Sequence, residues 1–164
     1  MKRPRAFYSA IPVLIVMAVI FFLSAQSGTA SGKSSEIPTA MALWLLRGER
    51  GIRPVTEQDE LWLRVSFYVR KLAHFAEFGA LGFFLTLHLN CLTRRLERLW
   101  LPAWIFSCLY AVTDELHQFF SVGRSPSLRD CLIDWAGAAA GAAIMIMILR
   151  RIKTPDPGSR REQT

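Results

Sequence analysis

The hydrophobic residues of the chain fall into four runs, which cover residues 7–25, 72–92, 100–121 and 131–149. Each run is about 20 residues long, and a helix that rises ~1.5 Å per residue crosses a ~30 Å hydrocarbon core in that length. Because lipid offers no hydrogen-bond partners to the backbone, spans of this kind are helical. The pattern therefore predicts an all-α protein, a polytopic membrane bundle of four transmembrane helices.

The segment between the first and second runs is polar, with one shorter apolar stretch at residues 38–48. This stretch is too short to span a bilayer, so we expect it either to lie in the interface, anchored by Trp44, or to pack as a lid over the helix ends. A capping-box pattern predicts a second helix that starts near Glu57, follows the surface and enters the membrane near Lys71. The sequence thus predicts an extracytoplasmic loop with one or two short interfacial helices.

The chain has a net charge of +7, and its basic residues gather before the first run, between the second and third, and after the fourth. They are Lys2, Arg3, Arg5, Arg94, Arg95, Arg98, Arg150, Arg151, Lys153, Arg160 and Arg161. Four crossings put these segments on one side, which the positive-inside rule makes cytoplasmic. This placement predicts a multi-pass protein with both termini cytoplasmic, and it argues against a nucleic-acid partner. Residues 1–153 are expected to form a single membrane domain and residues 154–164 a disordered cytoplasmic tail.

Ionisable residues interrupt the apolar runs near one end of the predicted bundle. On the fourth run, Asp130, Asp134, Gly137 and Gly141 follow at spacings of four, three and four, which places them on one helix face. The two glycines form the small-xxx-small pattern of close helix contacts. A charge at the bilayer centre costs ~2.5–3.5 kcal/mol or more, so residues of this kind indicate a functional site by default.

Helices that alternate in direction bring the polar residues of three runs to a similar depth. At ~1.5 Å per residue, Glu77 lies roughly 9 Å, Asp114 about 10 Å and Asp134 about 7–8 Å below the outer surface. We therefore predict an inward-facing polar pocket just beneath the extracytoplasmic boundary. Its expected residues are Lys71, His74, Glu77, Asp114, Glu115, Gln118, Arg124, Asp130 and Asp134.

Taken in order, four segments between about residues 10 and 150 resemble the VanZ-like family of bacterial membrane proteins. The matching positions are Phe22, Ser24 and Gln26; Lys71, His74, Glu77 and Phe78; Asp114, Glu115 and Gln118; and Arg124, Asp130, Asp134, Gly137 and Gly141. The last three groups follow the family patterns K-x-x-H-x-x-x-[YF], D-E-x-x-Q and R…D-x-x-x-[ND]-x-x-G-x-x-x-G. The family often has tyrosine at Phe78 and proline at Val122, so the predicted site lacks one hydroxyl group.

The resemblance implies a role in the bacterial cell envelope, and the founding member of the family is linked to low-level resistance to the glycopeptide teicoplanin. Together with the predicted pocket, it indicates a protein of the cell membrane that binds or remodels an amphiphile at the outer leaflet. That amphiphile would be a membrane lipid or a lipid-linked envelope component. Arg124 and Arg129 could hold its anionic headgroup while the carboxylates bind its polar or cationic part.

Other functions remain compatible with the same residues. A metal-dependent intramembrane hydrolase is one alternative, because histidine and carboxylate groups can bind a divalent metal or act as general acid and base. The sequence contains neither the H-E-x-x-H nor the G-x-S-x-G signature. A structural polar network that fixes helix register is another alternative. Transport is disfavoured because the polar residues stop at one depth. The sequence leaves open whether the protein is an enzyme, which metal or cofactor it takes and how it oligomerises.

Overall fold

The computed structural model describes residues 3–26, 28–47, 60–93, 98–120 and 127–153. Within these ranges the secondary structure consists of α-helices, and no strand is present. The helices are α1 (Arg3–Ser24), α2 (Gly28–Arg47), α3 (Glu60–Thr93), α4 (Trp100–Phe119) and α5 (Leu128–Lys153). The predicted all-α class is confirmed. The expected disorder of residues 154–164 falls outside the described residues and stays a prediction.

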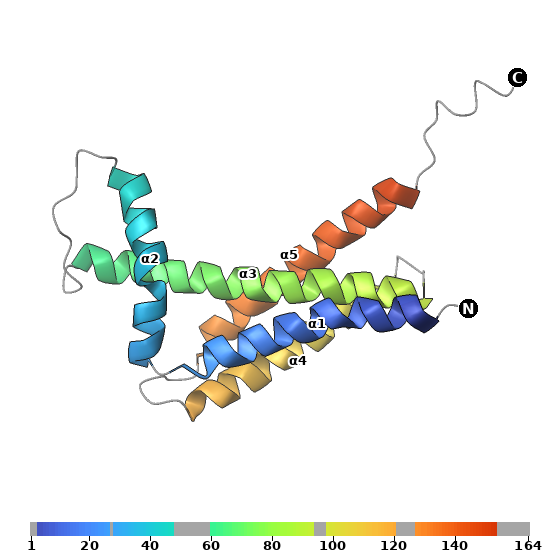
Figure 1. The fold of residues 1–164 in the computed structure, drawn as a ribbon, viewed down its shortest axis with the longest axis horizontal. Helices are drawn as coiled ribbons and strands as arrows, with labels where there is room; N and C mark the ends of the chain where they lie inside the picture. Colours follow the sequence, from blue (N-terminus) through green and yellow to red (C-terminus); the bar gives the residue numbers. More distant parts are fainter. Residues whose placement is uncertain (1–2, 27, 48–59, 94–97, 121–126, 154–164) are drawn as a thin grey trace, which may run out of the picture.

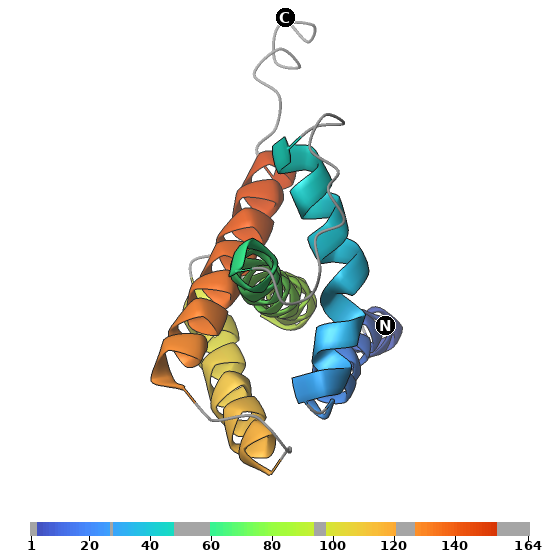
Figure 2. The same cartoon turned by 90° about the vertical axis from the view of Figure 1, so that its left-hand side faces the viewer.

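The long helix α3 is the axis of the structure (Figure 1). It contacts each of the other four helices: α1 lies along it, α4 and α5 are inclined to it, and α2 lies across its first turns. The view down the long axis places α2 and α5 on opposite sides of α3 (Figure 2). The start of α1 and the end of α5 lie toward one end of the molecule, and α2 lies toward the other.

Among the residues that the structure describes, three helices are long and apolar enough to cross a membrane. The qualifying segments are Ala6–Ser24 in α1, Glu60–Thr93 in α3 and Leu128–Ile152 in α5. The prediction of four spans is therefore supported for three helices. In α4 the last two turns carry two acids, a histidine and a glutamine, and these polar residues lower its mean hydropathy.

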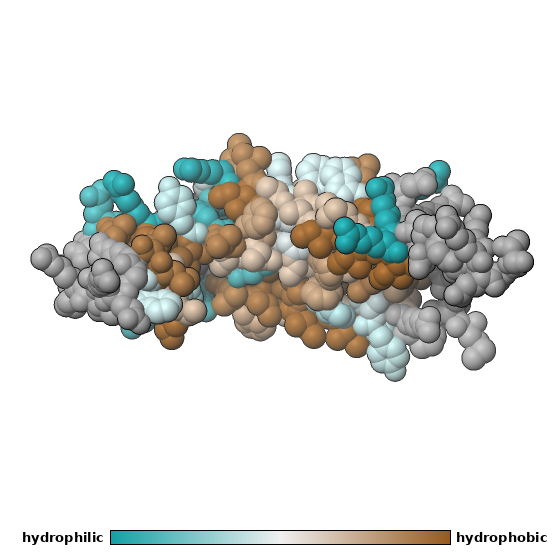
Figure 3. Space-filling model, turned by 90° about the horizontal axis from the view of Figure 1, so that it is seen from above, coloured by the Kyte–Doolittle hydropathy of each residue, from teal (hydrophilic) through white to brown (hydrophobic). Residues whose placement is uncertain are grey.

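The outer faces of the helices are strongly apolar, as expected for contact with lipid. On α1, Phe7 and Phe22 are 71% and 70% exposed, and α3, α4 and α5 carry further exposed large apolar side chains. Hydrophobic residues dominate the middle of the surface seen from above (Figure 3). An apolar surface of this extent is far larger than the patches that soluble monomers expose, so it supports a membrane environment.

Helix α2 differs from the short interfacial helix expected over residues 38–48. It already begins at Gly28 and has Pro38 in its interior. Ser35, Thr39 and Leu43 recur at a spacing of four residues and are buried, and the Ser35 hydroxyl lies 3.4 Å from a serine hydroxyl of α3. This buried stripe explains why the helix extends into the polar sequence that precedes the apolar stretch: it packs on α3.

The helix expected to precede the second span and to continue into it near Lys71 corresponds to α3, which continues without a break from Glu60 to Thr93. Its predicted start near Glu57 lies outside the described residues. Because Lys71 and His74 lie on one uninterrupted helix, helical periodicity sets the direction of each side chain about the helix axis.

Glycines bring α3 and α5 into backbone contact. A Cβ atom added to Gly82 would press into the backbone carbonyl of Ala138, and one added to Gly141 would press into the carbonyl of Gly79. Contacts this close leave no room for any side chain, which is the physical basis of the small-xxx-small pattern in membrane helices. The predicted glycine stripe of α5 therefore faces α3.

Hydrogen bonds from aromatic side chains fix α4 against its neighbours. Tyr110 donates its hydroxyl to the backbone carbonyl of Met17 on α1 at 2.7 Å. The indole of Trp104 donates to the carbonyl of Trp135 on α5 at 3.1 Å, and the indole of Trp135 donates back to the carbonyl of Cys108 at 3.3 Å. These reciprocal bonds satisfy polar atoms inside an apolar interface and set the register of α4.

Candidate functional site

The carboxylates of α5 meet basic side chains of α3 just before the glycine contact. Asp130 Oδ2 lies 2.5 Å from Lys71 Nζ, and both side chains are about a quarter exposed or less. One turn deeper, Asp134 Oδ1 lies 3.9 Å from His74 Nδ1. The two helices run in the same direction, so residues four apart on α5 face residues three apart on α3. The glycine packing brings the two sets together.

Asp134 is the most deeply buried acid of this cluster. Its side chain is 1% exposed, and neither carboxylate oxygen has a hydrogen-bond partner within the described residues. The separation from His74 is too long for a hydrogen bond. Burial of a carboxylate without such bonds is costly. An unsatisfied buried group of this kind is rare in native structures.

Helix α4 contributes the other half of the cluster through its buried polar end. Asp114, Glu115 and Gln118 are only 4%, 5% and 6% exposed. Gln118 Nε2 donates to Asp114 Oδ2 at 2.9 Å, and the backbone N–H of Ser127 donates to Glu115 Oε2 at 2.9 Å. Both carboxylates thus have one partner, and the bond to Ser127 ties α4 to the segment that leads into α5.

The acids of α4 and α5 form one electrostatic cluster. Asp134 lies close enough to Asp114, Glu115 and Asp130 for mutual repulsion, with Lys71 as the cation that opposes it. On the α1 side the cluster is closed by Ser24, which is buried and lies beside Asp114. It is further closed by His117, whose ring stacks on Phe21 at a centroid distance of 4.6 Å. The inner part of the site therefore gathers several acids.

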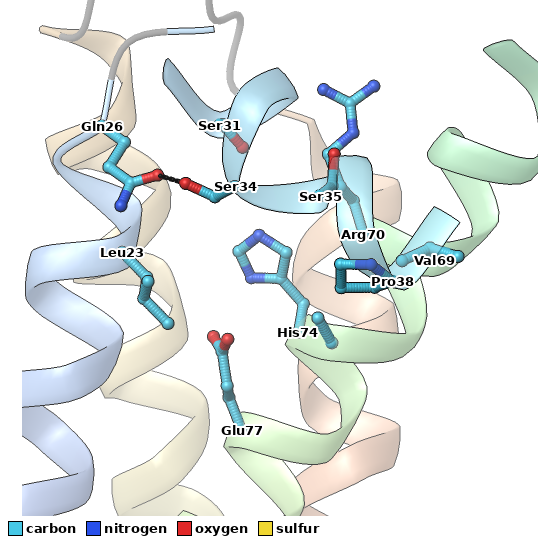
Figure 4. A pocket seen from close by; sticks show the side chains of 11 residues that line it. Leu23, Gln26, Ser31, Ser34, Ser35, Pro38, Val69, Arg70, His74 and Glu77 are labelled. Atoms are coloured by element: carbon cyan, nitrogen blue, oxygen red, sulfur yellow. Dashed lines mark hydrogen bonds between the residues drawn. The ribbon is translucent and has the colours of Figure 1, made fainter. Parts of the chain in front are cut away.

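A pocket of about 180 Å³ opens on the opposite face of α3, between α1, α2 and α3 (Figure 4). It is lined by Leu23, Gln26, Ser31, Ser34, Ser35, Pro38, Val69, Arg70, Ala73, His74 and Glu77. In the close-up the imidazole of His74 occupies the centre, the carboxylate of Glu77 lies below it and Arg70 stands at the upper end. His74 also approaches Asp134, so this residue connects the pocket with the buried carboxylates.

The structure brings most of the predicted site residues together. The clustered residues are Lys71, His74, Asp114, Glu115, Gln118, Asp130 and Asp134. Glu77 lies instead on the pocket side of α3. Arg124 lies outside the described residues, and Arg129, considered as a second headgroup ligand, is exposed at the start of α5. The functional role of these residues stays a prediction.

Several residues of the pocket were not predicted from the sequence. Arg70 precedes His74 by four residues and so shares its face of α3. The serines of α2 gather within residues 31–35, and Ser34 donates to the side-chain oxygen of Gln26 at 2.8 Å. The short serine-rich run before the apolar stretch is visible in the sequence. Its serines reach the pocket only because α2 packs against α3.

A metal site was one of the alternatives considered for the acids and histidines. Within the ranges that the structure describes, no group of three or more His, Cys, Asp or Glu side chains is arranged to hold a metal ion. The hydrolase alternative therefore has no ligand set among these residues, and it stays a hypothesis.

A comparison with known protein families gives one result that bears on identity. Residues 9–150 match the VanZ/LLP1 family. Searches of curated proteins and of solved structures gave no significant match. The family match includes the buried acids, the glycine contact and the pocket-lining residues of α3, and it confirms the resemblance seen in the sequence motifs. Because the match extends over most of its length, this chain belongs to the VanZ/LLP1 family.

Proposed function

We propose that α1, α3, α4 and α5 all cross the membrane, with both termini on the cytoplasmic side. Two observations support four crossings. The start of α1 and the end of α5 lie toward the same end of the molecule, where Arg150 and Arg151 follow the last span. The acids that lower the hydropathy of α4 are buried inside the bundle and are kept away from lipid.

This topology predicts opposite accessibility for two exposed positions. In a background that lacks Cys91, Cys108 and Cys131, a cysteine in Lys33→Cys is expected to react with a membrane-impermeant maleimide on intact cells. A cysteine in Arg151→Cys is expected to react only after the membrane is permeabilised. Labelling of Arg151→Cys on intact cells would overturn the proposed orientation.

We further propose that the protein binds or remodels an amphiphilic molecule of the cell envelope at the outer end of the bundle. The observation that carries this proposal is the pocket beside the buried carboxylates, with His74 shared between them. The volume of the pocket is about 180 Å³, and we expect it to take a polar headgroup while the apolar part of the ligand stays outside. The apolar part of such a ligand would lie against exposed side chains such as Met41 and Phe22.

Arg70 is the cation of the pocket, and its side chain forms no ion pair within the described residues. Arg70→Gln is expected to weaken binding of an anionic or zwitterionic amphiphile by about tenfold or more, because a hydrogen bond to a charged group contributes ~1.5–3 kcal/mol. Calorimetric titration of the purified protein measures this loss, with dioctanoyl phosphatidylglycerol, dioctanoyl phosphatidylethanolamine and teicoplanin as probes.

Arg64→Gln is the matched control, because Arg64 lies on the same helix but is exposed and paired with Glu60. Equal binding by both variants, or no binding of any probe to the unsubstituted protein, would contradict the proposal. Tight binding of teicoplanin would connect this chain with glycopeptide resistance. Conversion of a bound lipid into products, lost in Asp114→Asn, would instead favour the hydrolase alternative.

A further inference from the structure

The pocket has opposite charge at its two ends, and both ends are set by one helix. Arg70, His74 and Glu77 follow on one face of α3 at spacings of four and three residues. Seven residues of helix separate the two charged positions by roughly 10 Å along the axis. The close-up shows Arg70 at the upper end, Glu77 at the lower end and the His74 ring between them (Figure 4).

Further acids lie beside the His74 ring of the pocket. Asp134 lies behind His74, 1% exposed and without a hydrogen-bond partner within the described residues. Asp114 is also near enough to His74 for an electrostatic attraction. The nearby cation Lys71 is directed to the other side of α3, where it pairs with Asp130. Two buried acids thus lie next to His74, between the charged ends of the pocket.

The upper end offers groups that suit an anion. Arg70 stands there with the hydroxyl groups of α2, and hydroxyl and guanidinium groups are the usual donors to phosphate oxygens. Ser31 and Ser34 line the pocket with Arg70, and Ser35 closes it against α3. A ligand that matches both ends carries a positive group and a negative group a few atoms apart.

We propose that this pocket selects a headgroup of the phosphoethanolamine type, with its ammonium group toward Glu77 and its phosphate toward Arg70. This inference rests on the proposed function and names the ligand class for the same site. A primary ammonium group donates three hydrogen bonds, and the carboxylate of Glu77 offers acceptor oxygens at the lower end of the pocket. A choline headgroup has no N–H donor, and a phosphoglycerol headgroup has no positive charge, so both match the lower end less well.

The test compares headgroups that differ only at the cationic end. Dioctanoyl phosphatidylethanolamine, phosphatidylcholine and phosphatidylglycerol are titrated into the purified protein in detergent, and water-soluble glycerophosphoethanolamine is titrated in parallel. The unsubstituted protein is expected to bind phosphatidylethanolamine at least tenfold more tightly than the other two lipids. Comparable affinity for the water-soluble compound would mean that the headgroup alone is recognised; much weaker affinity would identify the membrane lipid as the source.

Two pocket variants and one control complete the test. Glu77→Gln is expected to reduce the preference for phosphatidylethanolamine over phosphatidylglycerol to less than threefold. Arg70→Gln is expected to weaken the binding of both lipids and to keep the preference. Glu60→Gln, an exposed acid on the same helix, should change neither. Equal binding of the three lipids by the unsubstituted protein would overturn the inference and leave the proposed function intact. Absence of all lipid binding would overturn both, and this comparison does not depend on whether Glu77→Gln folds.

Discussion

Replacing Gly141 with alanine is expected to destabilise the protein by about 1–3 kcal/mol or more, the cost of forcing extra atoms into a packed interface. The added Cβ would meet the backbone carbonyl of Gly79, and a backbone atom cannot rotate away as a side chain can. α3 and α5 would have to separate, which would also pull Asp134 away from His74. Thermal unfolding in detergent, followed by intrinsic tryptophan fluorescence, measures the loss.

Gly32→Ala provides a matched control for this prediction. A Cβ added at Gly32 meets nothing within 4 Å, and alanine is favoured over glycine in a helix interior by about 1 kcal/mol. The control is expected to leave the unfolding temperature unchanged or to raise it. An equal decrease in both variants would show that the interface between α3 and α5 is not as tight as the structure indicates.

Asp134→Asn is expected to raise stability while it lowers ligand binding. The substitution replaces a buried carboxyl group that has no hydrogen-bond partner among the described residues with a neutral amide of similar size, and an unpaired charge is costly to bury. The same change removes an acid from beside His74, so affinity for phosphatidylethanolamine should fall several-fold. Thermal unfolding and lipid titration on one preparation measure the two effects.

Asp130→Asn separates this expectation from a purely structural role. Asp130 has a partner in Lys71, so its replacement breaks an ion pair and is expected to lower stability by about 1–2 kcal/mol, since the pair is partly exposed. If Asp134→Asn raises the stability and Asp130→Asn lowers it, Asp134 is a group kept for function at a cost in stability. If both variants were destabilised equally, the acids would act as a network that fixes helix register.

The part of the site that lies between α3, α4 and α5 could be predicted from the sequence because helical periodicity determines it. The spacing from Asp130 to Gly141 places acids and glycines on one face, and a glycine face has to meet another backbone closely. The polar end of α4 had to be buried because charge facing lipid is costly. The structure agrees: Asp114 and Glu115 are buried, and Gly141 contacts Gly79.

The pocket between α1, α2 and α3 could not be predicted, because it depends on how α2 docks. The first half of α2 is too polar to be recognised as a packing helix, and the stripe of Ser35, Thr39 and Leu43 becomes significant only once it lies on α3. Arg70 likewise reaches the pocket only because α3 is already helical several turns before His74. Tertiary packing, not local pattern, decided both.

The length of α3 determines how a ligand would reach the pocket. Its 34 residues extend about 51 Å, some 20 Å more than a ~30 Å hydrocarbon core. In the proposed topology, with Thr93 at the inner boundary, the outer boundary falls near Ala73, between the two charged residues of the pocket. The opening is then level with the phosphates of the surrounding leaflet. A neighbouring lipid could exchange into it by sideways diffusion, without being lifted from the bilayer.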